Sequence, residues 1–395
     1  MSERAPLAGR FPLSAAFELT ARCNLRCRMC FIRVDERRIR ELGARELTAA
    51  EWIGLARQAA EMGTLNLLLT GGETMLRPDF PEIYEAVMGM GFFITLYTNA
   101  TLITPEIREL LTRLPPHKIG VTLYGASPET YERTCGIAAG YKRALEGISF
   151  LIGLPGKLEI RTTLVKDNVK DLDGIRALAG SFGRHVPFTI SNIVSKAVRG
   201  GVCDVEACRL SPEEQLELYI DETVRTALEA ADPLAGTQAE AKLRNELSHV
   251  PLQKHRQECE SGIRSGKGPR ASLFGCGAGM DQYAVAWDGR LIGCQMLDQR
   301  GTDALQGLRQ AWERYPETVA LPQFDPICLG CARKQDCMAC PATRLAESGS
   351  LGGIPEYSCR LVELSTNFDV ERIRSIYSNE KVHKTGNQVS THSHY

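Results

Sequence analysis

Residues 15–30 read AAFELTARCNLRCRMC, a short run with β-strand character followed at once by three cysteines. These residues, Cys23, Cys27 and Cys30, form the cysteine trio, with the spacing C-x3-C-x2-C. Three thiolates on one loop can hold three irons of a four-iron four-sulfur cluster, which normally has four cysteine ligands. The fourth iron would then be open to a small molecule. A structural zinc site would need a fourth protein ligand from elsewhere, and the trio alone leaves that interpretation open.

The chain around this stretch alternates between strand and helix patterns up to about residue 195. Near-continuous apolar strands that alternate with amphipathic helices predict a parallel sheet covered by helices. Six β/α units in about 180 residues favour an open, partial (β/α)6 TIM-like barrel over a closed eight-fold one. The expected strands are residues 15–21, 64–70, 92–98, 118–124, 158–165 and 188–194, and the expected helices are residues 48–62, 81–90, 104–114, 141–154 and 172–181.

Unusual side chains stand at the carboxyl ends of these expected strands, where parallel α/β folds place their active sites. The first strand ends at the cysteine trio and the second at Gly71-Gly72-Glu73. Thr98 and Asn99 end the third strand, and Thr122 and Tyr124 end the fourth. Glycines and polar residues also mark ordinary turns, but their occurrence at four strand ends together favours a functional site.

The composition argues against several classes of function. The 395 residues carry a net charge of −1, which gives no basis for general binding to nucleic acid or to an anionic membrane. No apolar run approaches the roughly 20 residues of a membrane span, and residues 1–20 contain no apolar signal-peptide region. We therefore expect a cytoplasmic protein whose 14 cysteines are metal ligands or redox groups rather than disulfides.

Seven cysteines crowd the last third of the chain and form the C-terminal array. They follow the pattern Cys276-x12-Gly289-x4-Cys294, then Cys328-x2-Cys331-x5-Cys337-x2-Cys340, then Cys359. Residues 283–296 (YAVAWDGRLIGCQM) predict a β-hairpin that turns at Asp288-Gly289. Helical stretches are expected at about 212–231 and 238–249, between the barrel and this array.

The segment CNLRCRMCF, residues 23–31, resembles the signature of the radical S-adenosylmethionine (radical SAM) superfamily, and the resemblance covers about residues 14–195. It implies that S-adenosylmethionine (AdoMet) binds the open iron through its amino and carboxylate groups. Reductive cleavage then gives methionine and a 5′-deoxyadenosyl radical, which abstracts hydrogen from a substrate. In such enzymes the cofactor carries the difficult chemistry while the protein positions it.

The same resemblance implies AdoMet contacts at the strand ends. Gly71 and Gly72 would permit close backbone approach, and Glu73 would accept hydrogen bonds from the methionyl ammonium. Thr74 replaces the proline that is usual in the family. Arg133 would pair with the methionyl carboxylate, or is an ordinary solvated helix charge. The remaining contacts implied for the cofactor are Met29, Phe31, Thr98, Asn99 and Thr122.

The C-terminal array resembles the SPASM domain, a seven-cysteine module that holds two auxiliary four-iron clusters in radical SAM enzymes. The pairing of that family implies Cys328, Cys331, Cys337 and Cys359 for one cluster and Cys276, Cys294 and Cys340 for the other. Two residues instead of the usual three precede Cys340. The second cluster is closed either by Cys259 or by no protein ligand, which would leave an iron open to a substrate thiolate. A zinc-ribbon-like structural domain is the alternative for the array.

SPASM-containing enzymes most often modify ribosomally made peptides or proteins, so the resemblance implies a peptide or protein substrate. A small-molecule dehydrogenase or epimerase of the same superfamily and a metal-binding protein without turnover are the alternatives. No fused peptide-binding domain fits before the trio, so a leader peptide would need a separate binding protein or recognition by the barrel. Flavodoxin or ferredoxin is the expected electron donor.

Three more residues are candidates for catalysis. Cys203 and Cys208 would donate a hydrogen atom to a substrate radical, or are ordinary loop thiols. Asp281 would act as a base, whereas Cys135 is expected to be structural and Tyr124 to contact substrate or to pack. The expected domains are a radical SAM partial barrel (1–200), a helical bridge (201–255), a SPASM domain (256–378) and a polar, disordered tail (379–395).

Overall fold

The computed structural model describes residues 9–191, 194–198, 201, 204–230, 274, 276–297, 301–319, 322–334 and 336–366, with side chains in the segment 204–230 described to residue 222. The chain divides into two compact units. The first unit comprises residues 1–209, 270–324 and 340–353, and the second comprises 210–269, 325–339 and 354–395. The expected helix at 238–249, Cys203, Cys259 and the tail at 379–395 lie outside the described residues.

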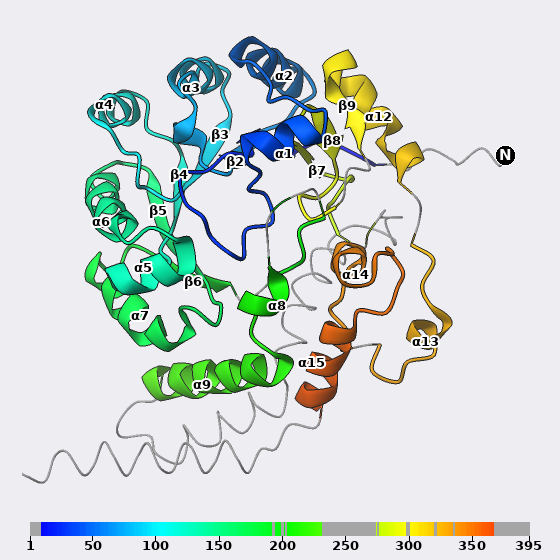
Figure 1. The fold of residues 1–395 in the computed structure, drawn as a ribbon. Helices are drawn as coiled ribbons and strands as arrows, with labels where there is room; N and C mark the ends of the chain where they lie inside the picture. Colours follow the sequence, from blue (N-terminus) through cyan, green and yellow to red (C-terminus); the bar gives the residue numbers. More distant parts are fainter. Residues whose placement is uncertain are drawn as a thin grey trace, which may run out of the picture. The chain divides into compact units, whose positions relative to one another are not determined.

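The first unit is built on one sheet, with the strand order β6-β5-β4-β3-β2-β1-β7-β8-β9. Strands β1 to β6 are parallel neighbours in chain order, which confirms the predicted six-strand partial barrel (Figure 1). Their bounds are β1 Ser14–Thr20, β2 Asn66–Gly71, β3 Phe93–Thr98, β4 Lys118–Thr122, β5 Lys157–Thr163 and β6 Phe188–Ser191. The sixth expected strand, 188–194, is therefore shorter than predicted and ends at Ser191.

Helices cover the outer side of these parallel strands (Figure 1). They are α1 Glu36–Glu41, α2 Ala49–Glu61, α3 Phe80–Met88, α4 Pro105–Arg113, α5 Pro128–Cys135, α6 Ala139–Leu151 and α7 Leu172–Ser181, with short 3-10 turns η1 Thr74–Leu76 and η2 Val169–Asp171. Thr48 and Glu51 form the predicted capping box of α2, and Thr104 caps α4. The sequence prediction missed α1 and α5.

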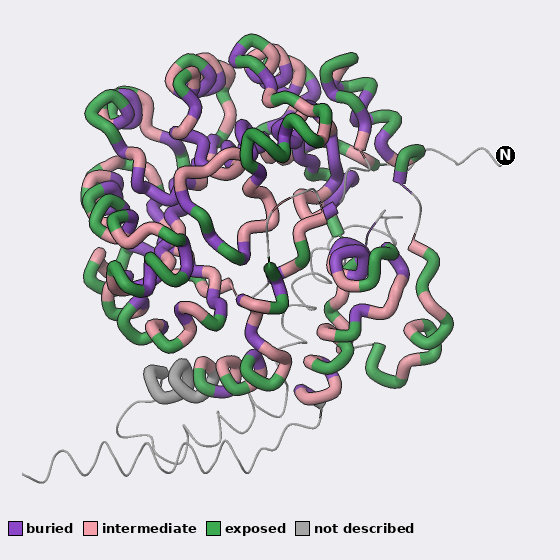
Figure 2. The backbone as a smooth tube through the Cα atoms, viewed as in Figure 1, coloured by how far each residue is buried: buried purple, intermediate pink, exposed green. Residues whose placement is uncertain are grey.

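The core lies between the sheet and the covering helices. Figure 2 shows buried positions concentrated along the strands and on the inner sides of the helices. Trp52 of α2 is fully buried, and its ring centroid lies 5.2 Å from that of Phe17 on β1. Truncating such an aromatic residue to alanine costs about 3–5 kcal/mol. This packing fixes the position of β1, and with it the loop that carries the cysteine trio.

The C-terminal hairpin belongs to the same sheet as the barrel strands. β7 (Gln282–Val285) and β8 (Arg290–Ile292) are antiparallel and turn at Asp288-Gly289, as predicted, and β9 (Thr302–Asp303) follows. β7 pairs parallel with β1, from Ser14 opposite Gln282 to Phe17 opposite Val285. The sheet thus continues beyond the six predicted strands. In the first unit, η3 Ala304–Gln306, α8 Val205–Cys208, α12 Leu308–Thr318 and α14 Pro341–Ser348 complete the described helices.

The second unit contains α9 (Pro212–Ala230), α13 (Pro326–Leu329) and α15 (Glu356–Thr366). α15 packs against α9, and the Arg360 Nε lies 2.9 Å from the Glu213 Oε1. The Tyr357 hydroxyl donates a hydrogen bond of 2.9 Å to the Leu210 carbonyl oxygen. These contacts hold the helix that carries Cys359 within this unit.

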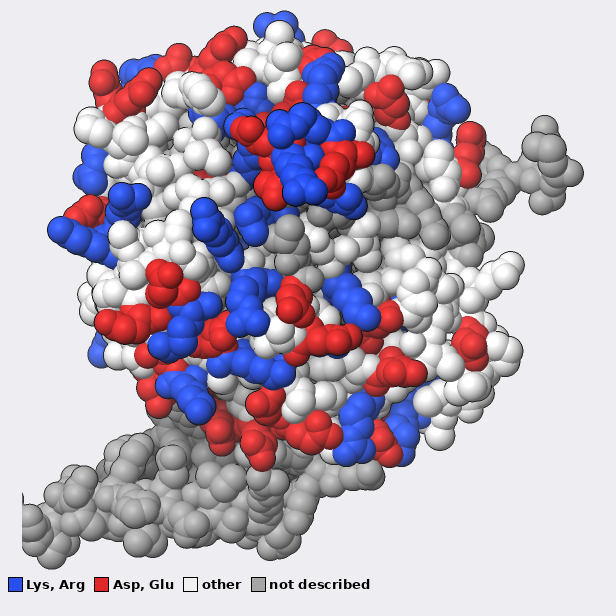
Figure 3. Space-filling view, viewed as in Figure 1, with Lys and Arg blue, Asp and Glu red and all other residues white. Residues whose placement is uncertain are grey.

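Charged side chains of both signs alternate on the face drawn in Figure 3, including the surface over α1. There, Arg37 and Arg38 pair with Glu41 at 2.9 Å and 3.2 Å. Among the residues that the structure describes, no helix is long and apolar enough to cross a membrane.

Candidate functional site

The cysteine trio lies in the loop that follows β1, at the carboxyl end of the parallel strands. Cys27 is buried, whereas Cys23 and Cys30 are half-buried. The loop aims backbone N–H groups at two of the sulfurs, because Leu25 N lies 3.4 Å from Cys23 Sγ and Arg33 N lies 3.2 Å from Cys30 Sγ. Donors of this kind stabilise sulfur in its anionic, metal-binding form.

Burial favours the neutral thiol form of two cysteines of the trio. Burial raises the pKa of Cys23, and the nearby Glu73 carboxylate raises it further. Burial also raises the pKa of Cys30. A bound metal reverses this effect, because coordination deprotonates a thiol outright. Three thiolates on one loop would hold three irons, and a fourth iron would remain for another ligand.

The donor set of the trio fits a four-iron cluster, because each of its three thiolates can bind a different iron. Among the described residues, no group of three His, Cys, Asp or Glu side chains is placed to hold a single metal ion.

The glycines that end β2 approach the loop of the trio. Gly72 N donates to the Thr20 carbonyl oxygen at 2.8 Å, and Glu73 N donates to the Arg22 carbonyl oxygen at 2.9 Å. A Cβ on Gly72 would lie 2.1 Å from the Arg22 oxygen, and one on Gly71 would lie 2.3 Å from the Thr20 oxygen. The close approach that the sequence predicted is thus made to the protein backbone that carries the trio.

Glu73 is a buried carboxylate with one acceptor position to spare. It accepts hydrogen bonds from Asn99 N at 2.8 Å, Met75 N at 3.2 Å and the Thr98 hydroxyl, which lies 2.9 Å and 3.0 Å from its two oxygens. Burial raises its pKa, and these hydrogen bonds oppose the shift. The three donors supply three protons, whereas a carboxylate has about four lone-pair positions. A further donor, such as an ammonium group, can therefore be accommodated.

Asn99, directly after β3, makes side-chain hydrogen bonds that hold the loop of the trio in place. Its amide Nδ2 donates to Asn24 Oδ1 at 2.9 Å and lies 3.8 Å from Cys23 Sγ. Its Oδ1 accepts from Thr101 N at 2.9 Å, and Thr101 Oγ1 in turn accepts from Asn24 Nδ2 at 2.7 Å. This closed network fixes the chain next to Cys23. Thr98 and Asn99, expected at the ribose, both make protein contacts in the structure.

The other residues expected at AdoMet lie in different surroundings. Met29 is buried within the loop, and Phe31 and Thr122 are half-buried. Arg133 is exposed on α5, where its guanidinium donates to the Thr130 hydroxyl at 3.0 Å and to the Asp167 carbonyl oxygen at 3.4 Å. Arg133 is thus engaged by the protein, and its pairing with a methionyl carboxylate stays a prediction.

The candidate catalytic residues are not brought together as a group. Cys208 is buried in the short helix α8 rather than in a loop. Asp281 is exposed immediately before β7, where its carbonyl oxygen accepts from Ser14 N at 3.0 Å. The roles proposed for these residues stay predictions.

The described cysteines of the C-terminal array are divided between the two units. Cys276, Cys294 and Cys340 lie in the first unit, and Cys328, Cys331, Cys337 and Cys359 lie in the second. Cys340 caps α14 and accepts from Thr343 N at 3.5 Å. Cys276, Cys340 and Cys359 are exposed.

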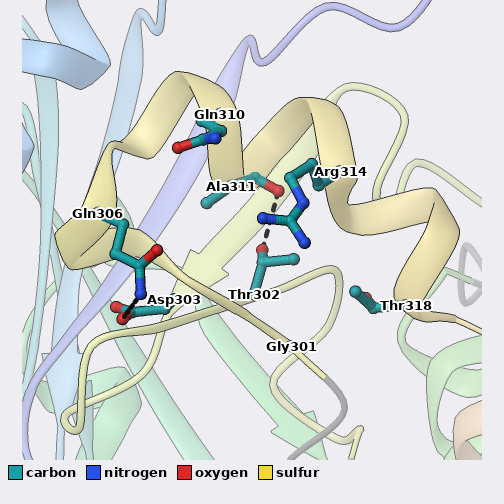
Figure 4. A pocket seen from close by; sticks show the side chains of 8 residues that line it. All are labelled: Gly301, Thr302, Asp303, Gln306, Gln310, Ala311, Arg314 and Thr318. Carbon is teal, nitrogen blue, oxygen red and sulfur yellow. Dashed lines mark hydrogen bonds between the residues drawn. The ribbon is translucent and has the colours of Figure 1, made fainter.

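A polar pocket of about 380 Å³ lies between β9, η3 and α12 in the first unit (Figure 4). Gln306 Nε2 donates to Asp303 Oδ2 at 3.0 Å, and the Thr302 hydroxyl donates to the Ala311 carbonyl oxygen at 2.8 Å. The lining residues are Gly301, Thr302, Asp303, Gln306, Gln310, Ala311, Arg314 and Thr318. None of them is a candidate site residue, so this pocket is separate from the strand ends.

Comparison with known proteins agrees with this geometry. Residues 17–179 match the family model described as the radical SAM superfamily. The chain contains a radical SAM domain. The match begins in β1 and includes the cysteine trio, Gly71-Gly72-Glu73 and the end of β3. The protein is therefore an enzyme with a radical SAM domain, and this domain implies a four-iron four-sulfur cluster and AdoMet.

Two relatives match most of this radical SAM protein. The AdoMet-dependent heme synthase of Methanosarcina barkeri is 28% identical over 352 residues, which are 86% of this chain and 93% of that protein. The PqqA peptide cyclase of Xanthomonas oryzae pv. oryzae is 25% identical over 349 residues, 86% of this chain and 85% of that protein. The sequence similarity thus extends beyond the parallel strands into the region of the C-terminal array.

Two solved structures share the fold. Streptococcus suis SuiB bound to its precursor peptide SuiA has a TM-score of 0.63 at 17% identity, covering 89% of this chain and 76% of that one. Native anSMEcpe with bound AdoMet has a TM-score of 0.61 at 14% identity, covering 93% of this chain and 100% of that one. At these identities the likeness establishes the architecture alone.

Proposed function

We propose that this radical SAM enzyme modifies a ribosomally made peptide or protein. The observation that carries the proposal is the cysteine trio, which lies beside Glu73 and Asn99 at the carboxyl end of the parallel sheet. The cluster and AdoMet, when bound, supply one-electron cleavage of AdoMet and a carbon radical that abstracts hydrogen. The relatives named PqqA peptide cyclase and the architecture shared with SuiB support a peptide substrate.

The residues of the chain would divide the work as follows. Cys23, Cys27 and Cys30 would hold three irons. The buried Glu73 would use its remaining acceptor position for the methionyl ammonium, whose positive charge would offset the cost of burying a carboxylate. The network of Asn24, Asn99 and Thr101 would keep the loop in place while these groups bind.

We infer that the C-terminal array holds two auxiliary clusters. The division of the array between the two units supports this inference, because its first set of three cysteines lies in one unit and its second set of four lies in the other. Cys328, Cys331, Cys337 and Cys359 would ligate one cluster completely. Cys276, Cys294 and Cys340 would supply three ligands to the other, and Cys259, which lies outside the described residues, stays a candidate for the fourth. An external one-electron donor such as flavodoxin or ferredoxin, a cytoplasmic location and a separate leader-binding protein complete the proposal.

A second candidate substrate is a tetrapyrrole. The relative that matches 93% of its own length is named an AdoMet-dependent heme synthase, and its 28% identity extends over 86% of this chain. This observation favours the small-molecule alternative, in which the same radical chemistry acts on a porphyrin-type ring without a leader peptide.

The test is substrate-dependent turnover of the anaerobically reconstituted enzyme with AdoMet and dithionite. Short open reading frames beside the gene would supply candidate peptides, and a scrambled peptide would be the matched control. We expect a mass change in one peptide that appears together with 5′-deoxyadenosine. A change in a tetrapyrrole with no change in any peptide would favour the second candidate instead.

A further inference from the structure

The inner face of the parallel sheet carries an arginine that stacks on a tyrosine. The Cζ atom of Arg161 on β5 lies 4.5 Å from the centroid of the Tyr97 ring on β3. The residues just before them, Leu96 and Ile160, belong to the buried core under the covering helices. Because successive side chains of a strand point to opposite faces, Tyr97 and Arg161 lie on the face turned away from those helices (Figure 1). Both are half-buried, so a molecule inside the barrel can reach them.

The sheet makes room for this stack at Gly120 of β4, the strand between β3 and β5. Gly120 is the register partner of Tyr97 on one side and of Glu159 on the other. A Cβ on Gly120 would lie 2.7 Å from two carbons of the Tyr97 ring and 3.5 Å from the Arg161 Cδ. A larger residue there would displace the ring, because the added atoms would overlap it. The fold therefore holds the guanidinium over the ring in a defined place.

The guanidinium of Arg161 keeps its donors for another group. Among the residues that the structure describes, it makes no hydrogen bond and no ion pair, and it contacts the Tyr97 ring instead. Lys118, on the same face, differs because its Nζ lies 2.5 Å from the Glu159 Oε2. The other oxygen of Glu159, Oε1, accepts a hydrogen bond of 2.6 Å from the Thr189 hydroxyl. Lys118, Glu159 and Arg161 together leave one positive charge in excess.

A half-buried arginine in this setting suits a carboxylate. Its planar guanidinium presents parallel N–H donors that match the two oxygens of a carboxylate. The aromatic ring attracts the cation without using those donors. The stack also lies within the strands, because Tyr97 precedes Thr98, whose hydroxyl contacts Glu73 at the strand ends. A carboxylate bound by Arg161 would thus lie beside the groups expected to hold AdoMet.

We propose that Arg161, held by Tyr97, binds a carboxylate of the substrate on the inner face of the barrel. The inference deepens the proposed function and rests on it in taking the substrate to bind inside the barrel. An acidic peptide side chain and a tetrapyrrole can both supply the carboxylate, so the two candidate substrates share this chemistry. Arg161 is the register partner of Thr122, one of the residues expected at AdoMet. The contact would therefore hold the substrate next to the cofactor that attacks it.

The test is equilibrium binding of two pairs of probes to the anaerobically reconstituted enzyme, with AdoMet titrated separately. One pair is a short, terminally blocked peptide with a central glutamate and the same peptide with glutamine. The other pair is deuteroporphyrin, a tetrapyrrole dicarboxylate, and its dimethyl ester. In Arg161→Gln, the Kd of at least one acidic probe should rise about 10- to 150-fold, as expected for losing a charge-assisted hydrogen bond. The Kd of its neutral partner should not change, and the pair that responds identifies the source of the carboxylate.

Two further variants make the test specific. Arg108 of α4 is also half-buried and also stacked, with its Cζ 4.9 Å from the centroid of the Phe150 ring, but it lies on a covering helix. Arg108→Gln is therefore the matched control and should leave the affinities for all probes unchanged. Arg161→Lys keeps the charge but loses the planar fork, so its Kd for the acidic probe should lie between those of wild type and Arg161→Gln.

Three results would overturn the inference. In the first, the wild-type enzyme binds the acidic and neutral members of each pair equally well. In the second, Arg161→Gln weakens the binding of acidic and neutral probes alike. In the third, Arg161→Gln raises the Kd of AdoMet and leaves the acidic probes bound, which would assign the arginine to the methionyl carboxylate. An acid-specific effect in an enzyme that turns over neither peptides nor tetrapyrroles would uphold the site and overturn the proposed function instead.

Discussion

The cysteine trio and the C-terminal array are built differently. The trio sits in one short loop braced from β2, β3 and α5, and its central cysteine is buried. The array is divided between two units, and Cys276, Cys340 and Cys359 are exposed. In the trio the fold prepares the ligands before any metal arrives. If the array holds the proposed auxiliary clusters, metal binding would have to contribute more of the organisation there, because ligand convergence and folding are coupled at such sites.

The largest effect is expected from Cys27→Ala. One iron loses its thiolate, so AdoMet cleavage should be abolished. The fold should persist, because the surrounding core remains. The measurement is 5′-deoxyadenosine formation under dithionite, with circular dichroism as the control for folding. Wild-type product formation would show that the trio does not hold the catalytic cluster.

Gly72→Ala tests whether the loop of the trio is preorganised by backbone contact. The added methyl group would lie 2.1 Å from the Arg22 carbonyl oxygen, so the two segments must separate. We expect a loss of about 3 kcal/mol in the free energy of unfolding, since overpacking usually costs 1–3 kcal/mol and here the neighbour is rigid backbone. Chemical denaturation of the cluster-free protein measures this.

Gly54→Ala in α2 is the matched control, because nothing lies within 4 Å of its added methyl group. In a helix interior this change should stabilise the protein by about 0.5–1 kcal/mol. Equal effects of the two substitutions would contradict the idea that Gly72 is required by the loop.

Glu73→Gln should weaken AdoMet binding and leave the cluster in place. Losing one charge-assisted hydrogen bond costs about 1.5–3 kcal/mol, which is roughly a 10- to 150-fold increase in Kd. Binding titrations on reconstituted enzyme would measure it, with iron content as the control. An unchanged affinity would mean that Glu73 serves only to hold Thr98, Asn99 and Met75.

The smallest effect on AdoMet cleavage is expected from the array. Cys359→Ala removes a ligand from the cluster proposed for the second unit, so about four of about 12 irons should be lost. Formation of 5′-deoxyadenosine without substrate should stay close to wild type. Iron analysis and product quantification test this together. A matching loss in Cys259→Ala would show that Cys259 closes the other auxiliary cluster, whereas intact spectra would favour an open iron.

Much of the fold could be predicted because its signals are local. Five long strands and their helices have clear periodicity, Thr48 and Glu51 form a capping box, and Asp288-Gly289 marks its hairpin. The missed helix α5 has a capping serine, Ser127, and a proline at its first position, so signals for it were present. Its eight residues are too few for strong periodicity.

The rest depends on contacts between distant segments. Nothing in residues 282–285 indicates that they pair with β1, because that contact joins opposite ends of the sequence. The spacing of the trio predicted a cluster, but spacing cannot show that the carbonyl oxygen of Cys135, expected to be structural, accepts a hydrogen bond from Arg26 N in the loop of the trio. In the same way, Gly71 and Gly72 were expected to make room for a cofactor, whereas the structure shows them packed against the backbone of residues 20–22.

The pairing of β1 with β7 can form only late in the synthesis of the chain. β1 is made first, but Gln282 follows Ser14 by 268 residues, since 282 − 14 = 268. At about 5–20 residues per second, the ribosome needs roughly 13–54 s to cover that distance. Through that interval one edge of β1 lacks its final neighbour, and an unpaired edge invites pairing with other chains. The loop that carries the trio leaves from this strand, so its support is complete only once most of the chain has been made.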